Sequence, residues 1–570
     1  MWLVVYNARP EGRSAFVHNG FFHENRKRGK IMASTFSGAK SRRGMRIRND
    51  AGASASWVGV ALLGAVLALP AAVPGVVGAT GKGVDVYAES ARPEMATQKI
   101  AFESKLHSPG LPLKYSAYLM KDAGTADVPL YVMMEYSETS TLQLLETFAA
   151  EGLIPPGLIV FIANDSLRPT VKGGFPRYQR GTLFDKPGRC FPDILVEEVI
   201  PAAAAMCKVS VTADPDLHFI SGSSAGGGAT LNAAWLRNDY FHRCYAISPL
   251  PDATLIKLIR FCEAKPLRVY ITTGDKEPDR VSGDLFLGNM ALRAAFDYAG
   301  YPCELTYYPQ GGHNAGKGNP AQMRRVFEFV FKDWRTKKIV PERNPIRVST
   351  LVASPGWKES HSAVPPRNVS VAAADGVYTV SGGKILFAKD GVSTVVADGF
   401  RRISGLSLSS DLWRLYVADE DDRYVRVMTV RKDGSLGGPF RHAPVMITDE
   451  ATRLGACDIL TLENDRVLLA TELGVQSAMS FGTLDVVLPL PGDLPVDRIW
   501  MKGKTLFAAS GSRVFERELL VAVAPEGRIS EPDKAYYAIP GENRNSSHLD
   551  QFAPAFETGQ SVVITNRIAR

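Results

Sequence analysis

No two of the six cysteines in this 570-residue chain are spaced as C-x-x-C. They are Cys190, Cys207, Cys244, Cys262, Cys303 and Cys457. Structural zinc sites and dithiol redox centres use that spacing, so the sequence supports neither kind of site. The spacing leaves open whether some cysteines pair as disulfides or remain buried free thiols.

An excess of charge of one sign is also lacking over most of the chain. The formal net charge is +7, but residues 1–79 contain eleven Lys and Arg against three Asp and Glu. The rest of the chain is therefore close to neutral, and a neutral protein has no electrostatic attraction to nucleic acid or to an anionic membrane. We expect neither as a partner, and the composition leaves the oligomeric state open.

The apolar segment near the N-terminus is too short to span a membrane comfortably. It starts at Trp57 after a basic stretch, is interrupted by Pro70, and is followed by Val77-Gly78-Ala79, the small residues that a signal peptidase reads. Residues 1–79 are predicted to be a basic extension and signal peptide cleaved after Ala79, and residues 80–94 a short linker. A membrane anchor is the alternative. We expect a periplasmic or secreted protein with no stable membrane insertion after cleavage.

Residues 95–335 alternate between apolar strands and helices. Strands are predicted at 115–119, 130–134, 158–163, 217–220, 244–247, 267–272 and 303–308, and helices at 142–151, 191–206, 225–234, 289–298 and 320–334. Repeated strand–helix units with continuously apolar strands are typical of a mostly parallel sheet with helices on both faces. The predicted fold class of this domain is therefore α/β.

The second half of the chain has a different pattern. Residues 336–366 contain five prolines and no apolar period, which predicts a linker. From 367 to 570 short strands alternate with tight turns. The stretches "GLSLSSDLWRLYVADEDDRYVRVMTV" and "DILTLENDRVLLATELGVQSAMSF" share one order of strands and polar turns. A recurring four-strand unit of roughly 40–50 residues indicates an all-β propeller of about four to six blades.

One short stretch of the α/β domain carries a pattern typical of catalysis. "HFISGSSAGGGATLNAAW" passes from an apolar strand through Gly222-Ser223-Ser224-Ala225-Gly226 into a small-residue helix. Glycine and serine are common in ordinary turns. A strand, a sharp G-x-S-x-G turn and a helix together, however, form the elbow that exposes a nucleophilic serine. Ser224 is the candidate nucleophile, and the N–H of Ala225 is a candidate oxyanion donor.

A serine nucleophile needs a base and an acid, which follow it in the order Ser, acid, His in hydrolases with this elbow. His242 comes too soon after the elbow and is interpreted as a surface or capping residue. His313, in the glycine-rich loop "QGGHNAG", is the candidate base. The turn "TTGDKEPDR" offers three acids, Asp275, Glu277 and Asp279.

The α/β half resembles the enterochelin esterase family of α/β-hydrolases. The segments that carry the resemblance, in the family's order, are "GLIPPGLIVFIAN", "EEVIPAAA", "DPDLHFISGSSAGGGATLNAAW", "PLRVYITTGDKE" and "GYPCELTYYPQGGHNAG". The resemblance implies a carboxylic ester hydrolase and selects Glu277 as the acid, with Asp279 as the alternative. The family usually has Asp-Gly after the third strand, where this chain reads Met134-Glu135-Tyr136. The second oxyanion donor is therefore expected from the amide of Tyr136 or Ser137.

The C-terminal half resembles the gluconolactonase, or senescence marker protein, β-propellers. "GLSLSSDLWRLYVAD" and "LGVQSAMSFGTLDVVLPLPGDLPVDRIW" carry the resemblance. That family binds a divalent metal through a Glu, one or two Asn and an Asp. Here the Asp position falls near Asp458, with Cys457 at the ungapped position, Ser404 stands in place of an Asn, and no Glu is found between 369 and 376. A site with so few oxygen ligands should bind metal poorly, so no metal is expected.

The sequence therefore predicts an exported serine esterase that cleaves a small-molecule ester with no cofactor. The propeller would be a binding or structural module. Two alternatives stay open: a metal-dependent gluconolactonase-type lactonase acting through the propeller, and a non-enzymatic exported binding protein.

Overall fold

The structure is a computed structural model, which describes residues 99–163, 166–167, 177–178, 184, 187–280, 283–367, 369–524 and 562–564. The chain divides into residues 1–90 and residues 91–570, and all described residues belong to the second unit. The predicted signal peptide over 1–79 and the linker over 80–94 lie outside the described residues.

A mixed sheet forms the centre of the α/β part, with nine strands among the described residues. Its strands, in spatial order, are β1 (Ile100–Glu103), β2 (Pro112–Leu119), β4 (Leu158–Ala163), β3 (Leu130–Met134), β7 (His218–Ser223), β8 (Arg243–Ile247), β9 (Arg268–Lys276), β12 (Cys303–Gly312) and β29 (Val562–Ile564). Neighbours from β4 to β12 run parallel, while β1, β2 and β29 are antiparallel to their neighbours. The carboxyl ends of six parallel strands therefore meet at one edge of the sheet, where ligands bind in α/β folds.

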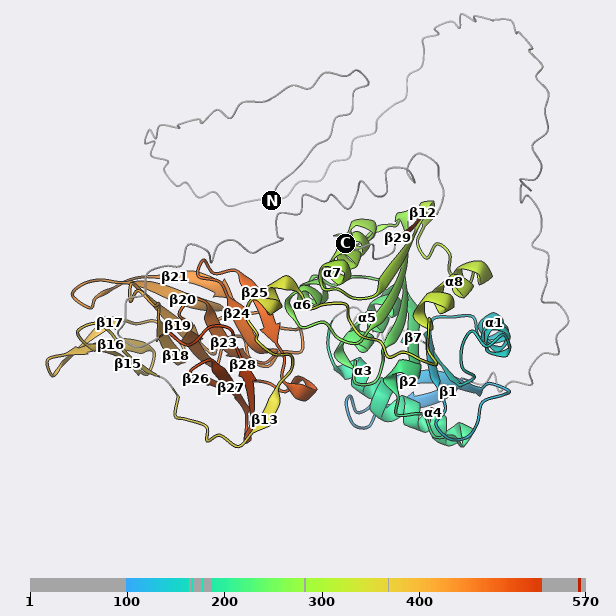
Figure 1. Cartoon of the computed structure of the whole chain (residues 1–570), viewed down its shortest axis with the longest axis horizontal. Coiled ribbons are helices and arrows are strands. Elements are labelled where there is room, and N and C mark those ends of the chain that lie inside the picture. The colour runs from blue at the N-terminus through green and yellow to red at the C-terminus, as the bar shows by residue number, and fades with distance from the viewer. Residues whose placement is uncertain are drawn as a thin grey trace, which may run out of the picture. The chain divides into compact units, whose positions relative to one another are not determined.

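Helices cover both faces of this sheet, as Figure 1 shows. One face packs against α1 (Glu138–Ala150) and α8 (Pro320–Val330). The other packs against α3 (Cys190–Ile194), the π-helical turn η1 (Leu195–Val199), α4 (Ile200–Cys207), α5 (Ala225–Leu236), α6 (Ala253–Phe261) and α7 (Leu285–Tyr298). Side chains alternate between the faces with the period of two that a strand imposes: Tyr131 and Met133 pack toward α1 and α8, Val132 and Met134 toward the opposite face. The predicted mostly parallel sheet with helices on both faces is confirmed.

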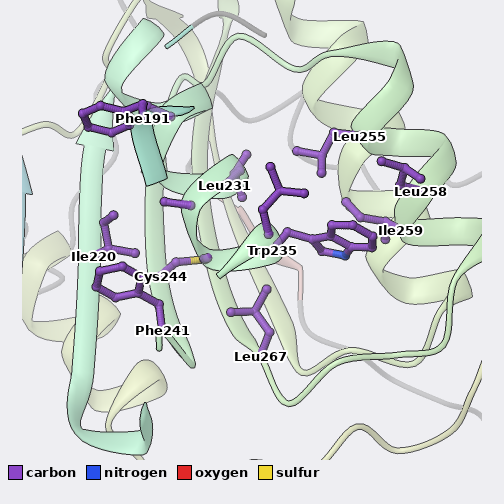
Figure 2. Close-up of a cluster of buried hydrophobic side chains, with 14 of the residues drawn as sticks. Phe191, Ile220, Leu231, Trp235, Phe241, Cys244, Leu255, Leu258, Ile259 and Leu267 are labelled. Atoms are coloured by element: carbon purple, nitrogen blue, oxygen red, sulfur yellow. The ribbon is translucent and has the colours of Figure 1, made fainter. Parts of the chain in front are cut away.

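The hydrophobic core on the second face surrounds the helix that follows the elbow (Figure 2). Trp235 and Leu231 of α5 lie between the apolar side of α6, including Leu258, and the strands β7 and β8, including Cys244. Every residue of α5 is buried. The run of small residues from 225 to 234 allows this helix to pack against the sheet, which fixes its first turn beside the strand end.

Among the elements that the sequence did not predict are β1 and α6, and α6 is capped by the Asp252 side chain, which accepts from the N–H of Thr254. Short additional elements are the 3₁₀ turn η2 (Pro215–Leu217) and the ribbons β5 (Ser166–Leu167) with β6 (Arg177–Tyr178) and β10 (Asp279–Arg280) with β11 (Gly283–Asp284). The stretch 336–366, predicted as a linker, contains α9 (Ile346–Ser349) and β13 (Lys358–Ser360).

The β-rich half contains four-stranded antiparallel sheets, four of them within the described residues. The first is β14 (Ser370–Ala372), β15 (Val377–Ser381), β16 (Lys384–Lys389) and β17 (Val392–Ala397); the second is β18 (Ile403–Leu408), β19 (Arg414–Asp419), β20 (Tyr424–Val430) and β21 (Leu436–Pro444). The third is β22 (Asp458–Thr461), β23 (Val467–Thr471), β24 (Gly474–Ala478) and β25 (Leu484–Leu488), followed by the 3₁₀ turn η3 (Pro491–Asp493). The fourth is β26 (Arg498–Lys502), β27 (Thr505–Ser510) and β28 (Arg513–Glu518), completed by β13. The two related sequence stretches are the first three strands of the second and third sheets, so the predicted four-strand repeat is present.

The C-terminal strand β29 lies outside this half, although the sequence prediction assigned residues 367–570 to it. β29 pairs with β12 at the edge of the α/β sheet, with Thr306 opposite Val563. Its partner β12 lies about 250 residues earlier in the chain, so no local sequence pattern reveals the pairing. All six cysteines fall within the described part of the chain, and each is a free thiol. Over that same part, no helix combines the length and apolar character needed to cross a membrane.

Candidate active site

The backbone at Ser224 has a conformation that residues other than glycine rarely adopt. Ser224 lies between β7 and α5 with φ 58° and ψ −122°. Such a geometry costs about 1–3 kcal/mol and persists only where the surroundings enforce it. Its N–H donates to the carbonyl of Ile247 at 2.8 Å, and its carbonyl accepts from Gly228 at 3.1 Å and from Leu250 at 3.3 Å. These bonds hold the serine on a sharp strand-to-helix turn, as the G-x-S-x-G pattern predicted.

The two glycines of this motif contribute differently. A Cβ on Gly222 would collide with the carbonyl oxygen of Gly226, the second residue of α5. A Cβ on Gly226 would meet Met134 at 3.4 Å, an ordinary van der Waals contact. The close approach of strand and helix thus requires glycine at 222 but not at 226.

His313 follows β12, and an irregularity in that strand decides its position. β12 pairs in register with β9 as far as Tyr308 opposite Gly274, and then resumes with Gly312 opposite Lys276. The residues between are looped out, with Gln310 at φ 58°. Because Gly312 pairs with Lys276, the residues that follow them, His313 and Glu277, leave two neighbouring parallel strands at the same level. Their side chains therefore emerge side by side beyond the carboxyl ends of the sheet.

Ser224, His313 and Glu277 form one hydrogen-bonded chain. Nε2 of His313 lies 2.9 Å from Oγ of Ser224, and Nδ1 lies 2.6 Å from Oε2 of Glu277. A carboxylate only accepts, so Nδ1 of the neutral imidazole carries the proton and Nε2 presents its lone pair to the serine hydroxyl. The arrangement can remove a proton from Ser224 and stabilise the imidazolium that results.

Neighbouring groups hold this chain in place. The Glu277 side chain is fully buried and His313 is 22% exposed. The Thr273 hydroxyl reaches the second Glu277 oxygen at 3.5 Å and accepts from the Asn289 side chain at 3.1 Å. The N–H of Asn314 donates to the Ser248 hydroxyl at 2.9 Å, which anchors the loop just after His313.

The other residues considered from the sequence lie elsewhere. Asp275 accepts a hydrogen bond from the Tyr307 hydroxyl at 3.1 Å. Asp279 is exposed in the β10–β11 ribbon. His242 bonds to Asp216 at 2.8 Å, near the opposite end of the strands. Of the three acids in the turn, all of which the structure describes, only Glu277 contacts His313.

The candidate oxyanion donors flank the elbow. Ala225 is the first residue of α5, and an N–H in the first turn of a helix has no acceptor within the helix. Glu135, directly after β3, has φ 63° and turns the chain toward Tyr136. The Tyr136 hydroxyl is bonded to Ser221 at 2.6 Å, and burial raises the pKa of this phenol above its ordinary value. The Tyr136 hydroxyl is thus already bonded, so Tyr136 could donate to an oxyanion only through its backbone N–H; the N–H of Ser137, at the start of α1, stays the alternative donor.

Lys317 and Ser223 were not singled out from the sequence. Nζ of Lys317 donates to the Ser223 hydroxyl at 2.7 Å, directly beside Ser224. A lysine in a glycine-rich loop gives no signal of its own, since most such lysines extend into solvent.

The metal position suggested by the second resemblance is filled by protein groups. The Asp458 carboxylate accepts from Nε of Arg498 at 2.9 Å and from the N–H groups of Ile499 at 3.1 Å and Ile459 at 2.9 Å. Burial raises the pKa of Asp458, and the Arg498 guanidinium opposes that shift. Ser404 donates to the carbonyl of Ala456 at 2.6 Å. No group of three or more His, Cys, Asp or Glu side chains suited to a metal occurs among the described residues.

Comparison with known proteins yields structural likenesses only. No protein-family model matches the chain, and no curated protein matches it. Solved structures similar to it include enterochelin esterase from Shigella flexneri, at 17% identity and TM-score 0.33, covering 42% of this chain and 59% of that one. A ferulic acid esterase has 19% identity and TM-score 0.31, covering 41% and 96%. The BES protein from Bacillus cereus has 15% identity and TM-score 0.30, covering 41% and 95%. The chain thus spans about three-fifths of the length of the enterochelin esterase.

Proposed function

We propose that this protein hydrolyses a carboxylic ester with Ser224 as nucleophile, His313 as base and Glu277 as the acid that orients it. The observation that carries the proposal is the continuous contact from Glu277 through His313 to Ser224, at 2.6 and 2.9 Å, on a strained strand-to-helix turn. An unassisted serine is a weak nucleophile, and this contact supplies the base that it needs.

The mechanism has two halves. In the first, Ser224 Oγ attacks the ester carbonyl while His313 Nε2 takes its proton, and His313 then gives that proton to the departing alcohol. In the second, water attacks the acyl-serine carbonyl while His313 Nε2 takes its proton; the bond from the acyl carbon to Ser224 Oγ then breaks, the carboxylic acid leaves, and His313 returns the proton to Oγ. Glu277 fixes the imidazole tautomer and stabilises the imidazolium. The N–H groups of Ala225 and Tyr136 are proposed to bind the oxyanion.

The β-rich half is proposed to be a propeller that binds or positions rather than reacts. The first strands of successive sheets, β14, β18, β22 and β26, are neighbours in that order, and β13 pairs with β28 to complete the last sheet. Radial repetition of four-stranded sheets around a centre has this neighbour pattern. The metal-dependent lactonase alternative lacks support, because Arg498 and two backbone N–H groups already occupy the Asp458 carboxylate.

Export stays a prediction, since it rests on residues 1–79. Sequencing the N-terminus of the protein recovered from the cell envelope tests it, and a mature N-terminus near Thr80 is expected.

The test of the hydrolase proposal combines turnover and covalent labelling. The purified protein is assayed on short p-nitrophenyl esters, aromatic esters, sugar acetates and lactones, and is treated with a fluorophosphonate probe. Ser224→Ala and His313→Ala are each expected to lower kcat on the order of 10³-fold or more, and the double variant should be little worse than either. Ser224→Ala should also abolish labelling. Full turnover by Ser224→Ala on every ester that the native protein cleaves would refute the proposal.

A further inference from the structure

Three chain segments that border the candidate site meet at the hydroxyl of Ser223. Ser223 precedes the nucleophile and is 1% exposed. Nζ of Lys317, four residues after His313, donates to its hydroxyl at 2.7 Å. That hydroxyl lies 3.5 Å from Oε2 of Glu135, on the segment after β3. The loop of the base, the elbow and the turn after β3 are thus linked through one buried oxygen.

The same ammonium also contacts the neighbouring aromatic ring. Nζ of Lys317 lies 5.8 Å from the centroid of the Tyr136 ring. Cations within about 6 Å of an aromatic ring are attracted to its face. Lys317 therefore faces both residues of the turn, Glu135 through Ser223 and Tyr136 directly.

The sign of the charges gives this contact a consequence for the reaction. Ester cleavage creates a negative oxyanion beside the N–H groups of Ala225 and Tyr136. The Glu135 carboxylate, next to Tyr136 in the chain, opposes that charge. The Lys317 ammonium and the Glu135 carboxylate contact the same Ser223 hydroxyl, so the positive charge offsets the repulsion between the carboxylate and the oxyanion. In a partly buried site such charge interactions are weakly screened.

We propose that Lys317 is a positioning residue that allows a negatively charged oxyanion to form next to the turn at Glu135–Tyr136. This proposal rests on the proposed hydrolase function. Through Ser223 it neutralises the Glu135 carboxylate, and through the Tyr136 ring it keeps the Tyr136 N–H beside the elbow. Its role is exerted in the transition state rather than in substrate binding, so it is expressed in kcat.

The experiment measures kcat and KM for the full chain on the best p-nitrophenyl ester. Lys317→Met is expected to lower kcat roughly 10- to 100-fold and to change KM less than about 2-fold, because misplacement at an active site costs up to about 10²-fold. Lys317→Arg keeps the charge and should restore most of the rate. Adding Glu135→Gln to Lys317→Met should also recover the rate, because no carboxylate then needs an opposing charge. Lys257→Met, on the exposed side of α6, is the matched control and should change neither constant.

Thermal unfolding of every variant accompanies the kinetics. If Lys317→Met is too unstable to assay, Glu135→Gln/Lys317→Met is compared with Glu135→Gln. The proposal requires kcat of the double variant to be less than 10-fold below that of Glu135→Gln. An unchanged kcat in Lys317→Met, a loss confined to KM, or a failure of Glu135→Gln to restore the rate overturns the role of Lys317 alone. Absence of both ester cleavage and fluorophosphonate labelling in the native protein overturns the hydrolase proposal, and the role falls with it.

Discussion

At the scale of single residues, Glu277 has the environment that an orienting acid requires. Its side chain is fully buried, one carboxylate oxygen contacts His313 at 2.6 Å, and the other faces Thr273. Both oxygens of this buried carboxylate therefore have a polar neighbour, as burial of a polar group requires.

We therefore expect Glu277→Gln to lower kcat by on the order of 10²-fold or more but by less than Ser224→Ala does, because the acid orients the imidazole and stabilises its charge without transferring a proton. Asp279→Asn, at an exposed position two residues away, is the matched control and should stay within about 2-fold. Steady-state kinetics on one ester, with unfolding midpoints to confirm folding, make the comparison. If Asp279→Asn loses most of its kcat while Glu277→Gln keeps a native kcat, Asp279 is the acid.

The sequence singled out Ser224 and His313 as candidates because their signals are local. The G-x-S-x-G turn and the glycines around His313 are readable in a few residues. The acid was ambiguous because three carboxylates occur within five positions. The pairing of Gly312 with Lys276 beyond the looped-out residues selects among them, and no local pattern encodes that register.

At the scale of elements, Glu198 of η1 fastens the segment between β1 and β2. Its carboxylate accepts from the Ser104 hydroxyl at 2.7 Å and from the N–H groups of Lys105 at 2.6 Å, Leu106 at 3.2 Å and His107 at 3.3 Å. Burial alone would raise the pKa of Glu198, but these hydrogen bonds outweigh it and lower the pKa from its usual 4.5 to about 2.

The lowered pKa of Glu198 makes its contribution dependent on pH. The stabilisation is complete above about pH 4.5 and is lost as the pH falls toward about 2, where the folded-state carboxylate takes up its proton. Glu198→Gln should lower the free energy of unfolding by about 1–3 kcal/mol at neutral pH, and the difference from the native protein should shrink at about pH 3. Urea unfolding at both pH values measures this. Glu197→Gln, whose carboxylate is 44% exposed, should cost less than about 1 kcal/mol. A difference that stays constant with pH would contradict the account.

Elements made of apolar residues could be predicted from the sequence. Elements that exist only because another strand pairs with them could not. β3 is buried throughout and β4 over its first five residues, and their bounds match the prediction. β13 consists of Lys358, Glu359 and Ser360, with no apolar side chain, and exists because β28 pairs with it. β1 has alternate residues exposed and depends on β2 in the same way.

At the scale of the whole molecule, we expect the protein to function without a bound metal. Asp458 is 1% exposed and already paired with Arg498, so a cation would have to displace a guanidinium. Calcium or zinc should shift the unfolding temperature by less than about 1 °C, because only a ligand that binds the folded state stabilises it. EDTA should leave ester hydrolysis unchanged. A saturable rise in unfolding temperature with calcium, or loss of turnover in EDTA, would favour the lactonase alternative instead.

The repeat of four-stranded sheets could be predicted from the pattern of strands and polar turns, whereas the ends of the β-rich half could not. The sequence prediction places Lys358 in the linker and Val563 in the β-rich half. In the structure the first completes the fourth sheet and the second joins the α/β sheet. The positions of both residues depend on pairing with strands that are distant in the sequence.

The pairing of β13 with β28 also governs when the β-rich half can finish folding. During synthesis β13 emerges first, and its partner β28 appears only after the three other sheets have been made. Contacts between residues far apart in sequence form slowly, because the chain between them must first be ordered. Until β28 arrives, the fourth sheet is incomplete, and an unpaired strand edge is a template for association with other chains. Chains that end before Arg513, or that lack Lys358–Ser360, should therefore accumulate in aggregates even though the first three sheets are intact.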